Sequence, residues 1–408
     1  MIKFIKNTFI IFFILIIFTS KGFSQKSIII FKTDYSNNYM NYAIYDLIIK
    51  NIFLYSDLKI INSYSNYSSY NKIKSQIKKL TINNNANISI AYQIQNFKNG
   101  ILINYIIFDN EKPNEWIEKS AYSKEEDLFI SINKILKDIY EISKIKNKIT
   151  YIKEKDYISL LGYYSQKIIL TNNEDNIYKL FYDFHKDNIY FNIDYLEYLT
   201  DKSDRTSVDI INDLIKNMQN YINKKKNHYY LYSLGCMHYG KYKVNVILSD
   251  IEASIENYNK ALKLKNNYYK YYYRLANAYI LKNDYDNAIK YYEEAIKLNE
   301  YDINIIKEFV SLLKRDINKN GNEVISYLKK IIEINKNDEE ALEEISKLYE
   351  KIGDYDNALI YYNKLFEVIN YNLYIINNET KDADAYDRYI LKRNSIKLNI
   401  ESLNKKIF

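Results

Sequence analysis

The feature that most constrains the fold is a pattern that returns at a fixed interval in the second half of the chain. The segment 258–264 (YNKALKL) lines up with 292–298 (YEEAIKL), which begins 34 residues later. The pentapeptide DYDNA at 284–288 occurs again at 354–358, an interval of 70 residues, or two periods plus two residues. Self-similarity at this period is typical of arrays in which each short unit buries its apolar face against the next.

Within one unit, residues 269–302, the apolar residues predict two short helices that pack against each other. They follow the helical spacing i, i+3, i+4 and i+7, first as Tyr272, Leu275, Ala276 and Tyr279 and then as Ala288, Tyr292 and Ala295. Asn283 and Asp284 interrupt this spacing and predict a turn. Small alanines let the helix axes approach closely, so each unit is expected to be a helical hairpin with one face left for its neighbour.

These units resemble tetratricopeptide repeats, which have the same 34-residue period and the same pattern of small and aromatic positions. Four units are identified, beginning near His228, Tyr269, Ile303 and Glu339. The first has an insertion at 241–250. The third is the least regular, and its two extra residues are expected in a loop at 318–321. The resemblance implies an all-α superhelix over residues 228–372.

The resemblance also implies that the array binds a protein or peptide in a concave groove lined by the first helix of each unit. The candidate groove residues are Tyr229, Tyr232, Lys270, Tyr273, Arg274, Asn277, Lys307 and Ser311. Lys270 and Arg274 lie one helical turn apart and resemble half of the clamp with which some proteins of this family hold a terminal carboxylate. Ser233 and Glu308 occupy positions where that clamp would need further donors. The alternative interpretation is that Lys270 and Arg274 are ordinary solvated charges.

Residues 25–145 carry a different pattern and predict a separate α+β domain ahead of the repeats. Its elements are expected in the order β-α-β-α-β-β-β-α, at 27–31, 40–53, 58–61, 70–80, 88–94, 101–108, around 116–117 and at 125–142. The fifth element is predicted from the alternation of large apolar with small or polar residues. Asn99-Gly100 predicts a hairpin turn after it. The fold class is therefore α+β followed by an all-α repeat region.

This order, with Asp109 followed by Trp116 after the hairpin, resembles the amino-terminal domain of the propeller protein of the Tol system. Related domains precede tetratricopeptide repeats in many bacterial envelope proteins. Trp116 is the only tryptophan and is flanked by charged residues. Its simplest role is to cover the sheet.

Residues 1–24 have the layout of a secretory signal peptide. A basic start is followed by an apolar run at 9–18, and the small side chains of Gly22 and Ser24 predict cleavage before Gln25. The run is shorter than the ~20 apolar residues that a membrane-spanning helix needs, although an uncleaved anchor is the alternative. We therefore expect an exported protein, periplasmic or associated with the envelope, with no integral membrane span after cleavage.

Two further regions flank the array. Residues 146–227 are predicted to form a helical junction with degenerate repeats, since the end units of such arrays are atypical. Residues 373–408 are predicted to contain a helix at 383–403 that caps the last unit.

No group of residues in the sequence predicts catalysis. His185 and His228 are isolated, and Cys236, the only cysteine, forms no more than a pair with His238, which is far short of a metal site. The glycines are scattered singly, so no phosphate-binding loop is predicted. We expect a protein that is not an enzyme and that needs no cofactor or metal.

The charge balance restricts the class of partner. The chain has 58 Lys and Arg residues against 51 Asp and Glu residues, a formal net charge of +7. Removal of residues 1–24, which contain three lysines, would leave 55 minus 51, or +4. So small an excess does not indicate a nucleic-acid partner. A single cysteine excludes an intramolecular disulfide, and the oligomeric state is left open.

Two functional hypotheses follow. In the first, an exported, non-enzymatic interaction protein of the cell envelope binds a protein segment in its groove while the α+β domain docks a second partner. In the second, the α+β domain binds a small molecule at the sheet edge near Asn104 and Trp116, and the repeats transmit its state. The repeats and the missing catalytic pattern favour the first, although fold alone does not specify function.

Overall fold

In this computed structural model the described residues are 26–31, 39–56, 58–61, 73–83, 85–97, 100–124, 126–144, 174–185, 188–202, 204–218, 227–380 and 382–407, with a few single positions between 152 and 163. They form two compact units, residues 1–271 and 272–408, and each is described by itself. The predicted signal peptide at 1–24 lies outside the described residues.

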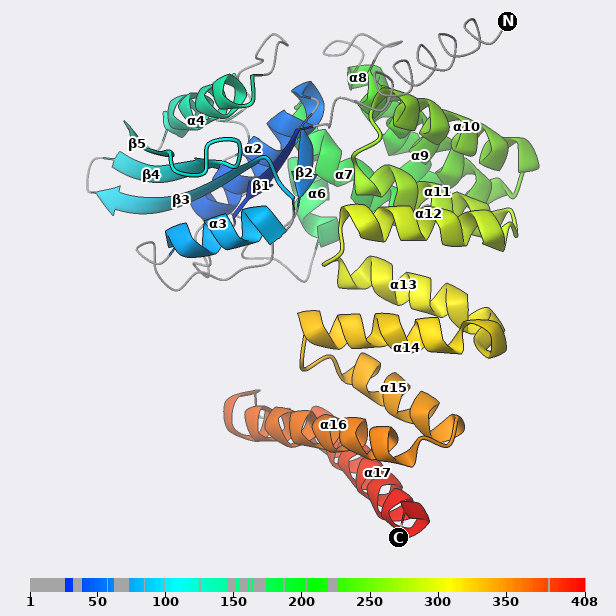
Figure 1. Ribbon diagram of the computed structural model, residues 1–408. Helices are drawn as coiled ribbons and strands as arrows, with labels where there is room; N and C mark the ends of the chain where they lie inside the picture. The colour runs from blue at the N-terminus through cyan, green and yellow to red at the C-terminus, as the bar shows by residue number, and fades with distance from the viewer. Residues whose placement is uncertain are drawn as a thin grey trace, which may run out of the picture. The chain divides into compact units, whose positions relative to one another are not determined.

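The first unit begins with a five-stranded mixed sheet. Its strands are β1 (Ser27–Ile30), β2 (Lys59–Ile61), β3 (Ile88–Phe97), β4 (Gly100–Asp109) and β5 (Trp116–Ser123), in the spatial order β2-β1-β3-β4-β5 (Figure 1). β1 pairs in parallel with β2 and β3, whereas β3, β4 and β5 are antiparallel. Helices α2 (Tyr39–Tyr55) and α3 (Ile73–Asn83) join the parallel strands, because a parallel pair needs a crossover connection.

Helices cover both faces of this sheet (Figure 1). On one face, Ile77 of α3 packs in a buried cluster with Ile29 of β1 and Phe108 of β4. On the other face, Tyr105 of β4 donates a hydrogen bond to Asp138 of α4 (Leu128–Ile142) at 2.6 Å. Tyr105 and Phe108 face different helices because side chains alternate along a strand. The observed order of elements confirms the predicted β-α-β-α-β-β-β-α arrangement.

The predicted junction is helical where the structure describes it, as α6 (Glu174–His185), α7 (Ile189–Lys202) and α8 (Arg205–Met218). Lys50 of α2 is buried, and its ammonium group lies 2.7 Å from Asp46 and 2.8 Å from Asp194 of α7. It also donates to the carbonyl of Tyr190 at 3.0 Å. A buried ammonium needs such partners because its desolvation is costly. These contacts attach the junction to the α+β layer.

The first repeat belongs to the same unit and consists of α9 (His228–Asn245) and α10 (Leu248–Leu264). Asn227 caps α9, because its side-chain oxygen accepts hydrogen bonds from the N–H groups of Tyr229 and Tyr230 at 2.8 and 3.1 Å. Val246 ends α9 with a left-handed φ of 56°. The predicted insertion at 241–250 therefore lies mostly in the ends of the two helices, which it lengthens.

The first repeat also packs against the α+β layer. The ring centroids of Phe53 in α2 and Tyr268 lie 4.1 Å apart. Lys265 is only 6% exposed, and its ammonium group donates to the carbonyl of Ser56 at 2.7 Å. Apolar and polar contacts thus join the α+β layer to the residues that follow α10.

The second unit continues the array. Its helices are α11 (Tyr269–Leu281), which begins at the boundary between the units, α12 (Tyr285–Leu298), α13 (Ile303–Leu313), α14 (Ile317–Ile334), α15 (Glu339–Lys351) and α16 (Tyr355–Ile375) (Figure 1). From α12 to α16, each helix packs against the next. Ala288, Tyr292 and Ala295 are at most 1% exposed, as expected for the contact stripe of α12. The first helices α9, α11, α13 and α15 begin at the four predicted residues.

The turns inside the second and fourth repeats have the same geometry. Asn283 and Gly353 adopt left-handed φ angles of 59° and 82°, a conformation that glycine and asparagine tolerate best. Asp284 and Asp354 follow them and cap α12 and α16, each accepting a backbone N–H hydrogen bond at 3.2 Å. The turn predicted at Asn283 and Asp284 is confirmed.

The third repeat turns differently, and the predicted loop at 318–321 is wrong. A 3₁₀ turn, η2 (Lys314–Asp316), leads directly into α14, which begins at Ile317. Ile317 has the repeat position of Asn283, since both lie 14 residues after the start of their repeats. A β-branched side chain adopts a left-handed φ only with strain, and Ile317 keeps a helical φ of −65°. The two extra residues therefore lengthen α14.

The last repeat is followed by a π-helical turn, η3 (Ile376–Thr380), and by α17 (Ala383–Ile407), which packs along α16. Ile396 and Leu403 of α17 are buried. The capping helix is thus present, but residues 373–375 belong to α16. Among the described helices, none has both the length and the apolar character needed to cross a membrane.

Candidate functional site

The first helices of the second unit carry a line of polar side chains, and Glu308 of α13 is its first member. The carboxylate of Glu308 accepts a hydrogen bond from the hydroxyl of Tyr273 in α11 at 2.9 Å. It also lies 3.0 Å from the hydroxyl of Tyr292 in α12, which is 2.5 Å from Asn277 Oδ1. Two of the predicted groove residues, Tyr273 and Asn277, therefore lie together where the second repeat meets the third.

Lys307, also on α13, bonds to the fourth repeat. Its ammonium group lies 3.0 Å from Asp338 and 2.8 Å from Glu340. Partial burial by itself would lower the pKa of Lys307, but the hydrogen bonds to Glu340 and Asp338 outweigh it and raise that pKa. Ser311 is exposed, and its hydroxyl donates to the carbonyl of Lys307 one turn earlier at 3.0 Å. These are the predicted groove residues of the third repeat.

The line continues to the end of the array. Lys314 lies 2.6 Å from Glu344 of α15. Glu339 of α15 accepts from the hydroxyl of Tyr389 at 2.8 Å and pairs with Lys392 at 2.7 Å, both on α17. We call the cross-helix contacts of Glu308, Lys307, Lys314 and Lys392 the polar row. It bonds α11 to α13, α13 to α15 and α15 to α17.

The other four predicted groove residues lie at or near the boundary between the units or in the first repeat. Tyr229 and Tyr232 are at most 1% exposed. Tyr232 donates to Glu197 at 2.6 Å, and Lys270 lies 3.6 Å from the same carboxylate. Arg274 is only 2% exposed, so it is not an ordinary solvated charge. Peptide binding by these residues stays a prediction.

The polar row differs from a clamp for a terminal carboxylate. Such a clamp needs cations that are available to the ligand, and Lys307, Lys314 and Lys392 each face acidic side chains. Glu308 lies where a further donor would be required. In the part of the chain that the structure describes, no group of three or more His, Cys, Asp or Glu side chains could hold a metal ion. The chemistry of the row is that of hydrogen bonding and ion pairing.

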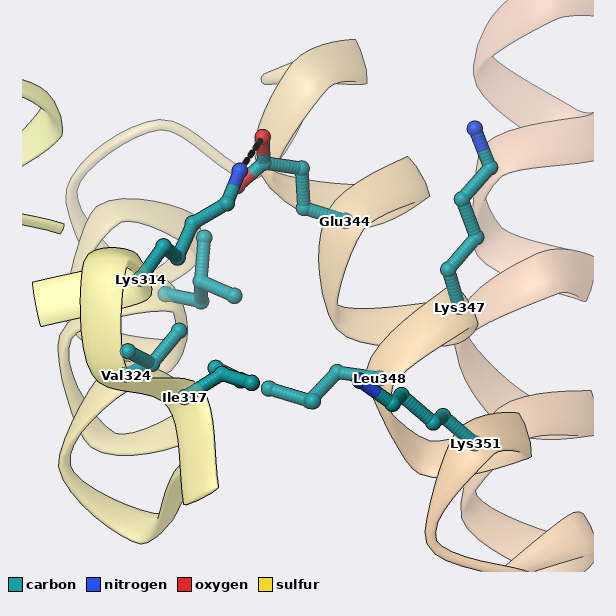
Figure 2. A pocket seen from close by; sticks show the side chains of 8 residues that line it. Lys314, Ile317, Val324, Glu344, Lys347, Leu348 and Lys351 are labelled. Atoms are coloured by element: carbon teal, nitrogen blue, oxygen red, sulfur yellow. Dashed lines mark hydrogen bonds and ion pairs between the residues drawn. The ribbon is translucent and has the colours of Figure 1, made fainter. Parts of the chain in front are cut away.

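A pocket lies between the third and fourth repeats, beside the unusual turn (Figure 2). Its volume is about 450 Å³, within the ~300–1,000 Å³ typical of ligand sites. The lining residues are Lys314, Ile317, Val324, Leu328, Glu344, Lys347, Leu348 and Lys351. Figure 2 shows Ile317 of α14 and Leu348 of α15 pointing toward each other, with Lys314 and Glu344 joined at one side. We call this the turn pocket.

The sequence contains a signal that could have predicted the turn pocket. Val324 has the repeat position of Ala288 and Ala358 once the two extra residues are counted. Ile317 replaces the turn residue that Asn283 and Gly353 supply in the neighbouring repeats. The repeat that departs most from the pattern is therefore the one with the pocket.

The sheet edge of the second hypothesis is also described. Trp116 of β5 is half-buried, and its ring lies 4.8 Å from that of Phe108. The ammonium group of Lys74 lies 5.9 Å from the Trp116 ring. Asn104 accepts a hydrogen bond from the hydroxyl of Ser120 at 2.6 Å. Trp116 thus covers the sheet, and ligand binding at this edge stays a prediction.

Comparison with known families identifies two of the four repeats. The sequence matches the tetratricopeptide repeat family at residues 269–302 and again at residues 339–372. These ranges coincide with the second and fourth predicted units. Neither range reaches the α+β layer, so its resemblance to the Tol-system domain stays an expectation. The search of proteins with curated descriptions found no match.

Several solved structures are similar to part of the chain. A crystal structure of MamA is 22% identical, covers 40% of this chain and 91% of its own, and gives a TM-score of 0.32. Another MamA structure is 21% identical, with coverage of 49% and 96% and a TM-score of 0.33. YrrB, described as a TPR protein with an unusual peptide-binding site, is 16% identical, with coverage of 46% and 89% and a TM-score of 0.29.

Proposed function

Because the chain is a tetratricopeptide-repeat protein, we propose that it is a non-enzymatic scaffold that binds a protein segment along the first helices of its repeats. The tetratricopeptide matches support a role in protein–protein interaction. No catalytic domain is identified in the chain. The proposal places the partner on the face formed by α11, α13 and α15, beside the polar row.

The observation that carries this proposal is the order already present in the polar row. Tyr273, Glu308 and Lys307 are held by hydrogen bonds between repeats. Side chains that are fixed before binding lose less conformational entropy when a partner arrives. Ser311 is exposed on the same helix and leaves part of this face accessible to a partner. A peptide would meet acceptors, donors and ion pairs in set positions.

The proposal extends to the location of the protein. Residues 1–24 have the sequence pattern of a signal peptide, and export would bring the repeats to the cell envelope. In that compartment the α+β layer would dock a second partner. Both statements rest on the sequence pattern and on the presence of two different kinds of domain.

Site-specific photo-crosslinking tests the binding face. A photoreactive residue placed at Ser311 should crosslink to a defined partner in living cells, because this exposed side chain lies beside the polar row. The matched control is Lys290, which is exposed on α12, outside the first helices. Equal partner yields from positions 311 and 290, or no partner yield from position 311, would contradict the proposed face.

A further inference from the structure

The turn pocket has an apolar floor and a basic rim. Ile317, Val324 and Leu348 belong to the floor. Val324 is 1% exposed, whereas Leu348 is half-buried, so the pocket reaches from the packed interior of the repeat to its surface. Apolar surface that stays in contact with water favours the binding of another apolar group.

The charges at the rim are not balanced by the protein itself. Lys314 pairs with Glu344 at 2.6 Å, and Lys347 pairs with Glu343 on its own helix. Lys351 has no acidic partner within the described residues. In Figure 2 the ammonium group of Lys351 points toward the pocket. The rim therefore has a cation available for an anionic ligand.

The position of the pocket connects it to the polar row. Lys314 and Glu344 belong to both, since they join α13 to α15 and also line the pocket. A segment bound along the first helices would pass the mouth of the pocket at this ion pair. Such a segment offers side chains that a pocket of about 450 Å³ can accept.

We propose that the turn pocket anchors a large apolar side chain of an acidic peptide segment, with Lys351 and its neighbouring lysines bound to carboxylates that flank this side chain. The inference rests on the proposed function and specifies the chemistry of the partner at one position. The apolar floor selects the anchoring side chain. The rim selects its acidic neighbours, since a basic peptide would meet like charges there.

Fluorescence anisotropy with synthetic peptides and the full chain tests this proposal. The probe is a short fluorescein-labelled peptide with one central leucine between runs of Asp and Glu. One control peptide has serine in place of the leucine, and a second has lysines in place of the acids. We expect the first peptide to bind at least roughly tenfold more tightly than either control, a difference of about 1.4 kcal/mol. Added salt should weaken its binding because the rim charges are exposed.

Two variants place the binding in the turn pocket. Lys351→Glu reverses the available rim charge at an exposed position, and Leu348→Trp fills the pocket from a half-buried position. Each should weaken binding of the acidic leucine peptide by roughly tenfold. Lys290→Glu makes the same charge change on α12 and should leave the affinity unchanged. Circular dichroism should show the same helix content in all three variants.

Several results would overturn the proposal. These are no binding of the acidic leucine peptide, no preference for leucine over serine, or no effect of Lys351→Glu and Leu348→Trp. Binding of a fatty acid such as decanoate at the same pocket, with no peptide preference, would assign it to a small amphiphile instead. Failure of the proposed function is distinguishable from these results, because it is measured by the crosslink yield at Ser311.

Discussion

The hydroxyl group of Tyr292 lies 3.0 Å from Oε2 of Glu308, and this contact bonds the second helix of one repeat to the first helix of the next. The Tyr292 ring also stacks on Phe309, with the centroids 5.5 Å apart. One tyrosine thus supplies apolar packing and a polar bond at the same boundary between repeats. Stability along the array should therefore depend on such side chains, since each repeat is stabilised by its neighbours.

Tyr292→Phe should weaken the boundary between the second and third repeats. The substitution keeps the ring but removes a hydroxyl that lies 2.5 Å from Asn277 Oδ1. Loss of a largely buried hydrogen bond costs ~1–2 kcal/mol. Hydrogen exchange of α12 and α13, followed by mass spectrometry, should report faster local opening. Tyr285→Phe, which removes an exposed hydroxyl from the same helix, is the control. Indistinguishable exchange in the two variants would contradict this role of Tyr292.

Gly235→Ala should destabilise the first repeat. Gly235 is buried in α9, and a Cβ atom at this position would overlap the ring of Tyr258 in α10. Overpacking of this kind costs ~1–3 kcal/mol. Gly321→Ala is the matched variant, because a Cβ atom there meets nothing within 4 Å and the residue lies inside α14. It should stabilise its helix by ~0.5–1 kcal/mol. Urea unfolding followed by circular dichroism should give opposite signs, and shifts of the same sign would contradict this expectation.

The first unit should lose stability in mild acid because of His228. Burial, together with the nearby ammonium group of Lys265, lowers the pKa of His228 to about 3, although hydrogen bonds to the backbone of Leu54 and Phe53 act in the opposite direction. In the unfolded chain this side chain titrates near 6.5. Below about pH 6.5 the unfolded state therefore binds more protons, and stability falls by up to ~1.4 kcal/mol per pH unit toward pH ~3.

Unfolding in urea at several pH values, followed by the fluorescence of Trp116, measures this effect. His228→Gln should make stability fall less steeply between pH ~6.5 and ~4, because the glutamine does not titrate. His185 remains in the variant, and burial lowers its pKa as well, so part of the slope should persist. Above pH ~6.5 the two proteins should show the same pH dependence. A slope unchanged by the substitution would show that His228 is already protonated in the folded state.

Export should remove residues 1–24. If the segment is a signal peptide, the protein recovered from cells should begin at Gln25. Amino-terminal sequencing of the envelope and soluble fractions measures this directly. Ser24→Leu should block cleavage and leave a longer chain in the membrane fraction, because signal peptidase requires small residues before the cleavage site. A chain that keeps Met1 and stays in the cytoplasm would refute the export proposal.

The regular parts of the array could be read from the sequence because each unit repeats the same local physics. Asn283 and Asp284 mark a turn by their own conformational and capping preferences, and Ala288 and Tyr292 mark a contact stripe by their spacing. These features are local, so their positions in the sequence determine their positions in the fold. The same holds for the strand alternation after Ile88.

The third repeat and the binding surface were harder to predict because they depend on neighbours. The two extra residues implied a loop only if Ile317 could turn the chain as Asn283 does, and its branched side chain prevents this. Burial of Tyr229, Tyr232 and Arg274 is likewise set by helices distant in the sequence. Repeat position alone gave the helix of each residue, but not its exposure.

The contact between Phe53 and Tyr268, reinforced by Lys265 at the carbonyl of Ser56, gives the array a direction. An open solenoid can be extended at either end by adding one more hairpin. Here the entry side of the first hairpin is occupied by the sheet domain, in place of a polar terminal cap. Lengthening or shortening of the solenoid through duplication should therefore be tolerated downstream of α11, whereas separation of the first hairpin from the sheet would expose aromatic surface to water.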